Sequence, residues 1–198
     1  MSTTASALPA IAAARSSRAS AAGVPGTTAP TRADRLVAIA SWPVALWTSY
    51  VFLGSLPYKF TNHPDTAHIF STIGDWLGTL LGGGIGAAFA RFGAYAVGSL
   101  ELLTAIVLLA PAALWLLGRA RGRRLGPSRA TLHAAGGLAA GALMAGAVFF
   151  HLVSPLGIVV LHEGQSDGGS LFFAAVSILT LGLATFALNV GRTARGPR

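Results

Sequence analysis

Residues 92–117 read FGAYAVGSLELLTAIVLLAPAALWLL, and Glu101 is the only charged side chain among them. The hydrocarbon core of a bilayer is crossed by about 20 consecutive apolar residues in helical form. No water is present there to satisfy backbone N–H and C=O groups, so such a segment must be a helix. The stretch therefore predicts a membrane-spanning helix that carries one carboxylate near its middle.

Three further stretches of the same kind predict an all-α integral membrane four-helix bundle. The expected spans are residues 36–56, 92–117, 131–155 (with an apolar extension to Leu161) and 171–190. Together they define one four-span domain over residues 35–191. It is preceded by a tail over residues 1–34 and followed by a short basic tail over residues 192–198.

The composition supports a membrane protein and excludes several kinds of soluble chemistry. Hydrophobic residues make up 53% of the 198-residue chain, charged residues only 10%, and the mean hydropathy is +0.64. Soluble domains carry about 25% charged residues. The chain has no cysteine, which excludes disulfides, thiolate nucleophiles, iron–sulfur clusters and cysteine-ligated zinc.

Residues 1–34 consist mainly of Ala, Ser, Thr, Gly and Pro with scattered Arg, and they include no aromatic residue. Such a segment buries too little apolar surface to offset its conformational entropy. A secretory signal places its cations before an uninterrupted apolar run, whereas here Pro9 interrupts the run and the arginines follow it. We expect a disordered cytoplasmic tail.

Positive charges predict the orientation of the spans. Of the 14 Lys and Arg residues, 12 lie before the first span, between the second and third, or after the fourth, and only Lys59 and Arg91 lie in the other two loops. The positive-inside rule then places both termini in the cytoplasm of a bacterial inner membrane. The net charge of +8 therefore does not indicate a nucleic-acid partner, because the cations flank the spans and lack interleaved aromatic residues.

The connection between the first two spans is too long for a simple turn. Over residues 63–81, apolar and polar residues each recur at helical spacing, which predicts an amphipathic helix lying in the outer membrane interface. Pro64 and Asp65 suit the first turn of that helix. The glycines that follow, Gly82, Gly83, Gly84 and Gly86, are expected to form a flexible joint.

Three ionisable residues lie on faces of small residues within or at the ends of the spans. Glu101 continues a seam with Ala94, Gly98 and Ala105, and His151 continues a seam with Gly137, Gly141 and Met144. Lys59 closes the first span on a line with Ser41, Ala45, Thr48, Phe52 and Ser55. We expect Lys59, Glu101 and His151 to converge in the outer half of the bundle.

Two interpretations of these three residues remain open. An intramembrane charge costs roughly 2.5–3.5 kcal/mol on insertion scales and therefore needs a partner inside the protein. Glu101 pairs with Lys59 or His151 either to set the helix register alone, or as part of a polar pocket for a small molecule or a partner subunit. The sequence does not decide between these roles.

Weaker candidate site residues lie in the outer loops. His63, Asp65 and His68 include metal-ligating side chains, but an exposed helix with these residues is usually solvated, and no metal site is expected. Asp167 precedes two glycines and predicts a turn into the fourth span. His162 is assigned to a loop, and His133 to the interface opposite His151 because it lies 18 residues earlier, about 27 Å along a helix.

Several short motifs resemble the DoxX-like family of small four-helix bacterial membrane proteins, over roughly residues 45–190. The motifs are LPYKFT (56–61), PDT (64–66), GSLELL (98–103), GALMAGA (141–147), FHL (150–152) and DGG (167–169). The resemblance implies a four-helix bundle, and some members of the family resemble subunits of quinone-linked membrane oxidoreductases or partners in oxidative-stress complexes. A quinone is therefore a candidate cofactor.

The sequence thus predicts a DoxX-like inner-membrane protein that is not an enzyme on its own. Its expected partners are the lipid bilayer and either a membrane partner subunit or further copies of itself. The paired cysteines of related quinone reductases are absent, which excludes their redox chemistry here. A quinone-linked oxidoreductase subunit and a small transporter are the alternative functions.

Overall fold

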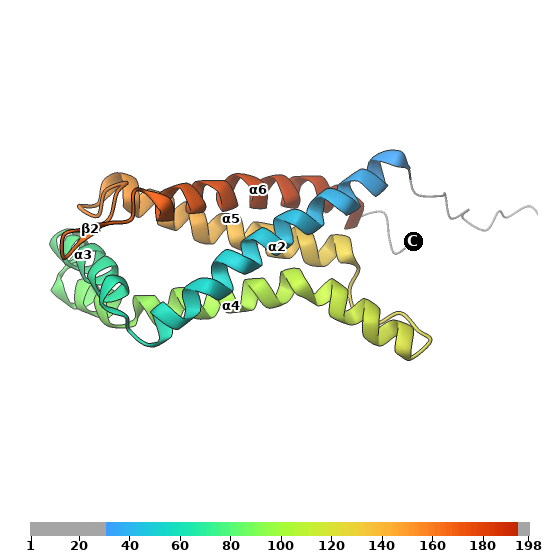
Figure 1. Cartoon of the computed structure of the whole chain (residues 1–198), viewed down its shortest axis with the longest axis horizontal. Helices are drawn as coiled ribbons and strands as arrows, with labels where there is room; N and C mark the ends of the chain where they lie inside the picture. The colour runs from blue at the N-terminus through green and yellow to red at the C-terminus, as the bar shows by residue number, and fades with distance from the viewer. Residues whose placement is uncertain (1–30, 194–198) are drawn as a thin grey trace, which may run out of the picture. The chain divides into compact units, whose positions relative to one another are not determined.

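The computed structural model describes residues 31–193 and contains five α-helices and one short hairpin within them (Figure 1). The elements are α2 (Arg32–Phe60), α3 (Pro64–Leu81), α4 (Gly83–Ala120), α5 (Arg129–Val153), β1 (Leu161–His162), β2 (Gln165–Ser166) and α6 (Ser170–Thr193). Of these, α2, α4, α5 and α6 are long and apolar enough to cross a membrane. The predicted all-α membrane helical bundle is confirmed.

The first and last helices extend past the expected ends of the four-span domain, and α4 begins nine residues before its expected span, at Gly83. α2 begins at Arg32, so residues 32–34 of the expected tail are helical, and residues 1–30 lie outside the described part of the chain. At the other end α6 includes Arg192 and Thr193, and the rest of the expected basic tail also lies outside the described residues.

The expected glycine joint is a break at one residue. Gly82 ends α3 with φ of 102°, a left-handed conformation that favours glycine, and α4 begins at the next residue. Gly83, Gly84 and Gly86 are helical. Gly86 instead permits a close approach to α3, because a Cβ on Gly86 would lie 2.7 Å from the Gly78 Cα. The sequence-based prediction of a flexible joint was therefore wrong for the three helical glycines.

α5 and α6 pack with their backbones in direct contact. A Cβ on Gly137 would lie 2.7 Å from the Gly182 carbonyl oxygen, and a Cβ on Gly182 would lie 3.1 Å from the Gly141 backbone nitrogen. Small residues at membrane helix interfaces allow such close approach, and packing then replaces the hydrophobic drive that lipid does not supply. In Figure 1, α5 and α6 lie side by side along most of their length.

α2 crosses the bundle from α6 to α4 (Figure 1). Near its start, Asp34 Oδ1 pairs with Arg192 Nε of α6 at 3.0 Å. Near its end, Lys59 lies against α4, where a Cβ on Gly98 would come within 3.3 Å of the lysine stem. The last turns of α2 therefore lie beside α4 and away from α6, and the cavity of the candidate site lies next to them.

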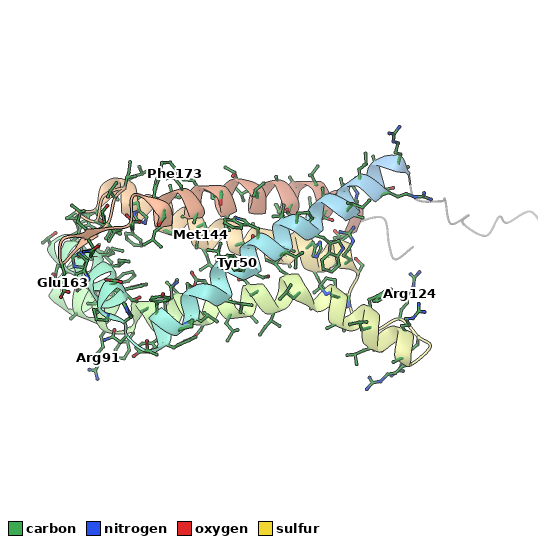
Figure 2. The ribbon with its side chains drawn as sticks, viewed as in Figure 1. Tyr50, Arg91, Arg124, Met144, Glu163 and Phe173 are labelled. Atoms are coloured by element: carbon green, nitrogen blue, oxygen red, sulfur yellow. The ribbon has the colours of Figure 1, made fainter. Side chains whose placement is uncertain are left out.

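The helix faces that do not pack inside the bundle are apolar. Large side chains such as Tyr50, Trp115 and Phe173 are more exposed than buried, and similar residues occur on all four long helices. A surface of this kind belongs in lipid, so the chain is a multi-pass membrane protein. Figure 2 shows Arg91 and Arg124 near opposite ends of the bundle, and Glu163 at the same end as the hairpin.

Candidate functional site

Lys59, Glu101 and Ser55 form a compact polar cluster between α2 and α4. Lys59 Nζ lies 2.8 Å from Glu101 Oε2 and donates a hydrogen bond to Ser55 Oγ at 2.9 Å. Ser55 Oγ lies in turn 2.7 Å from Glu101 Oε2. The Glu101 side chain is only 5% exposed and that of Lys59 15%, so the carboxylate is held in the bundle by an ammonium and a hydroxyl.

The sequence places these three side chains together through helical spacing. Ser55 and Lys59 are four residues apart and lie on one face of α2. On α4, the expected seam is buried at Ala94, Gly98, Glu101 and Ala105. Because Gly98 has no side chain, the stem of Lys59 packs directly over the helix one turn before Glu101. The seam prediction is confirmed, and the partner of Glu101 is Lys59.

His151 is buried on the predicted face of α5 but makes its hydrogen bond elsewhere. Its Nδ1 lies 2.6 Å from the carbonyl oxygen of Gly157, which only accepts, so Nδ1 carries the proton. In the neutral ring Nε2 is then an acceptor. The ring also packs edge-on against Phe172 of α6, with 5.7 Å between ring centroids. α5 ends at Val153, two residues before Pro155, as expected from the helix-ending effect of proline.

A cavity of about 790 Å³ lies between the α2–α4 pair and the α5–α6 pair, with α3 and the hairpin at its end. Lys59, Glu101 and His151 all line it, so the three predicted residues share one cavity although only the first two are bonded to each other. Most of the remaining wall is apolar and includes the rings of Phe70, Phe89 and Phe150. The size is within the range of small-molecule sites, about 300–1,000 Å³.

Asp167 fastens the hairpin to the start of α6. Its Oδ1 accepts hydrogen bonds from the backbone N–H groups of Val160 and Gly169 at 2.8 and 2.9 Å, and Oδ2 accepts one from Leu171 at 3.1 Å. Partial burial acts to raise the pKa of this carboxyl. The three N–H groups, with a smaller contribution from His151, outweigh burial and hold the pKa of Asp167 below its usual range. The predicted turn is confirmed.

Asp65 joins α3 to the hairpin. Its Oδ1 lies 2.7 Å from Nδ1 of His162 in β1, and its backbone N–H donates to Nδ1 of His63, the residue that caps α3. The ring of His68 stacks on that of His162 with 4.7 Å between centroids. Among the described residues, no group of three or more His, Asp or Glu side chains has the arrangement of a metal site.

His162 is the functional candidate that sequence reasoning missed. The hairpin turns at Glu163 and Gly164, both with positive φ (50° and 77°), which is the geometry of a tight two-residue turn. That turn directs His162 toward Asp65, 97 positions earlier in the chain. The pair Glu163-Gly164 is a weak turn signal, and nothing local in the sequence indicates the partner.

His133 lies in the opposite half of the bundle and is fully buried, with its ring edge-on to Trp42 at 5.0 Å. Arg129 Nη1 lies 3.4 Å from His133 Nδ1. Nearby, Asn189 Nδ2 donates to Ser41 Oγ at 3.1 Å and to the Thr185 carbonyl at 2.8 Å. These contacts connect α2 to α5 and to α6, and none of the residues lines the cavity.

Comparisons with known proteins found nothing similar: no family model, no curated protein and no solved structure matches the chain.

Proposed function

We propose that the protein is a DoxX-like multi-pass membrane protein, not an enzyme on its own, whose cavity binds a small molecule or a segment of a partner subunit. The observation that carries this proposal is the position of the Lys59–Glu101 pair. A pair that only set the helix register would be best enclosed by packed side chains, whereas this one borders a cavity of about 790 Å³.

The remaining wall suits an amphiphilic ligand. Lys59 and Ser55 offer hydrogen-bond donors or acceptors on one side, and His151 offers Nε2 on the other. Between them the wall is apolar, which provides affinity, while the few polar groups fix the orientation of the ligand. This division is typical of sites that are formed before the ligand arrives.

The charge distribution supports a bacterial inner membrane with both termini in the cytoplasm. The start of α2, the loop between α4 and α5 and the end of α6 carry most of the cations and lie at the same end in Figure 1. The positive-inside rule assigns that end to the cytoplasm. The cavity then lies in the outer half of the bundle.

A quinone-linked oxidoreductase subunit is the second candidate, and it depends on Lys59 and His151 as polar contacts for the ligand. A quinone has two carbonyl oxygens on an apolar ring, and Lys59 is a suitable donor to one of them. On the other side, His151 has Nε2 free of the Gly157 contact, and this nitrogen suits the hydroxyl of the reduced form. The protein supplies binding and orientation, and any electron transfer belongs to the partner.

The test is to fill the cavity without disturbing the bundle. Gly146 lines the cavity, and a Cβ there would meet nothing within 4 Å. Gly191, in the last turns of α6, is equally open and lies outside the cavity, so it provides the matched control. We expect material purified from native membranes in mild detergent to retain a small molecule or partner in the wild type and in Gly191→Leu, and to lose it in Gly146→Leu.

Native mass spectrometry and solvent extraction of the purified protein would identify what is retained. A recovered quinone supports the second candidate directly. If the wild type retains nothing that Gly146→Leu lacks, the binding proposal is wrong. Glu101→Gln, which keeps the shape of the side chain and removes its charge, separates the two roles of the pair: loss of the bound species with unchanged thermal stability indicates binding.

A further inference from the structure

The acidic residues of the chain are concentrated in one half of the bundle. The hairpin half contains the end of α2, all of α3, the first half of α4, the end of α5, the hairpin and the start of α6. Five of the six acidic residues of the chain lie there, and among residues 31–193 the only Lys or Arg side chains with them are Lys59 and Arg91. The acidic residues are Asp65, Asp75, Glu101, Glu163 and Asp167. A field of one sign raises the local concentration of oppositely charged solutes.

The wall of the cavity also has more acidic than basic side chains. One ammonium, that of Lys59, and three carboxylates, those of Asp65, Glu101 and Asp167, line it. Apart from the histidines, the wall therefore has two more carboxylates than ammonium groups. A low-dielectric wall strengthens the interaction of the buried Glu101 charge with anything that enters, whereas solvent screens Asp65, which is 58% exposed, more strongly.

The excess is stabilised by hydrogen bonds and not by further cations. Glu101 has Lys59, Asp167 accepts from three backbone N–H groups, and Asp65 lies against the His162 ring. Among the described residues, no second Lys or Arg lines the cavity. The wall therefore tolerates its negative charge without neutralising it, and a ligand that brings another anion meets repulsion.

Aromatic rings cover part of the same wall. Phe89 packs against Phe70 with 5.7 Å between ring centroids and against Phe150 with 5.5 Å, and all three line the cavity. The faces of aromatic rings attract cations, most strongly where the cation has already lost its water. An organic cation with apolar substituents satisfies both the rings and the carboxylates.

We propose that the cavity is selective for hydrophobic organic cations over anions of the same size. This inference rests on the proposed function, since it names the class of small molecule that the cavity takes. It explains why an apolar cavity in a lipid-facing bundle has three carboxylates on its wall and only one lysine.

The test compares two ions of nearly identical size and shape, tetraphenylphosphonium and tetraphenylborate. Binding of each to the purified full-length protein is measured by equilibrium dialysis in an uncharged detergent at pH 8, where histidine side chains are ordinarily neutral. Gly146→Leu under the same conditions provides the background from the detergent. We expect the cation to bind on the order of tenfold more tightly than the anion, with the preference reduced at high salt.

Two variants localise the effect. Asp65→Asn removes a carboxylate from the cavity wall, and Asp75→Asn removes one from the same helix outside the cavity. We expect Asp65→Asn to weaken binding of tetraphenylphosphonium by about threefold and Asp75→Asn to leave it within error. Thermal unfolding of both variants verifies that they are folded.

Each other result overturns the inference. Equal binding of the two ions, both lost in Gly146→Leu, shows that the cavity binds small molecules without charge selection and leaves the proposed function intact. Preference for tetraphenylborate contradicts the charge argument itself. Absence of binding of either ion contradicts the inference, and the material retained from native membranes then decides the proposed function separately.

Discussion

The contact between α5 and α6 and the wall of the cavity use glycine in opposite ways. Between α5 and α6, Gly137 and Gly182 bring two backbones together, and an added Cβ at either position would meet a carbonyl oxygen within 3 Å. In the hairpin half, Gly54 and Gly146 line the cavity, and an added Cβ would meet nothing within 4 Å. The same residue type therefore closes the space between helices in one region and leaves space open in the other.

This difference indicates how the bundle keeps a cavity without coming apart. In lipid, helices associate through packing and hydrogen bonds, and open space removes packing on every side of it. In the hairpin half, ion pairs and hydrogen bonds compensate for the lost packing. Lys59 pairs with Glu101, Asp65 contacts His162, and Asp167 accepts hydrogen bonds from the backbone around it. The α5–α6 crossing, in contrast, relies on contact between backbones.

The largest expected effect comes from disrupting the close contact between α5 and α6. Gly137→Leu places a branched side chain against the Gly182 carbonyl and the Phe186 backbone nitrogen, neither of which can move without shifting α6. We expect a loss of more than about 3 kcal/mol of stability or a failure to fold. The measurement is helical circular dichroism during a titration of detergent-solubilised protein with sodium dodecyl sulfate.

Gly146→Leu is the matched control, because it adds the same side chain to the same helix where the space is open. It is expected to change stability by less than about 1 kcal/mol. Equal destabilisation by the two substitutions would show that the distinction between closed and open glycines is wrong.

The next largest effect tests the Lys59–Glu101 ion pair, which borders the cavity. Lys59→Met leaves Glu101 buried without its ammonium, which we expect to cost about 2 kcal/mol, less than for a fully buried pair because Lys59 is partly exposed. Replacing both residues, as Lys59→Met with Glu101→Leu, removes the charge as well as its partner. The double variant is therefore expected to be more stable than Lys59→Met alone. Additive losses in this double-mutant cycle would mean that the two residues are not coupled.

The positions of the long helices could be predicted from the sequence because each depends on a local property. Apolar runs of about 20 residues predicted four spans, and the buried seam through Gly98 and Glu101 followed from helical spacing. The extra length of α4 was missed because Gly83, Gly84 and Gly86 have low helix propensity. The close contact of Gly86 with α3, which local patterns do not reveal, favours the helix despite that preference.

The site was predicted in part for the same reason. Lys59, Glu101 and His151 stood out because ionisable residues in spans are rare, and the structure places all three on one cavity. The contact between Asp65 and His162 depends on a hairpin that folds across from a distant segment. The four predicted spans also do not predict the cavity, because its volume depends on how α2 diverges from α6.

The smallest expected effect is the change in stability of the hairpin half at low pH. The folded state holds the pKa of Asp167 below its usual value of 3.8, so its carboxylate contributes stability above that pH and loses the contribution as pH falls through the folded-state pKa. Asp167→Asn is expected to cost about 1 kcal/mol at pH 6, a figure that allows for solvent screening of a partly exposed group. Below about pH 4 the difference in stability between the two proteins should shrink, because the protonated wild type has also lost the charge that faces the α6 N-terminus.

Measuring the unfolding of both proteins from pH 6 to pH 3 tests this expectation, and taking the difference between them removes the contribution of the other carboxyls. A difference that stays constant over this range would show that Asp167 acts through its shape and hydrogen bonds alone, and that the hairpin half does not depend on its charge.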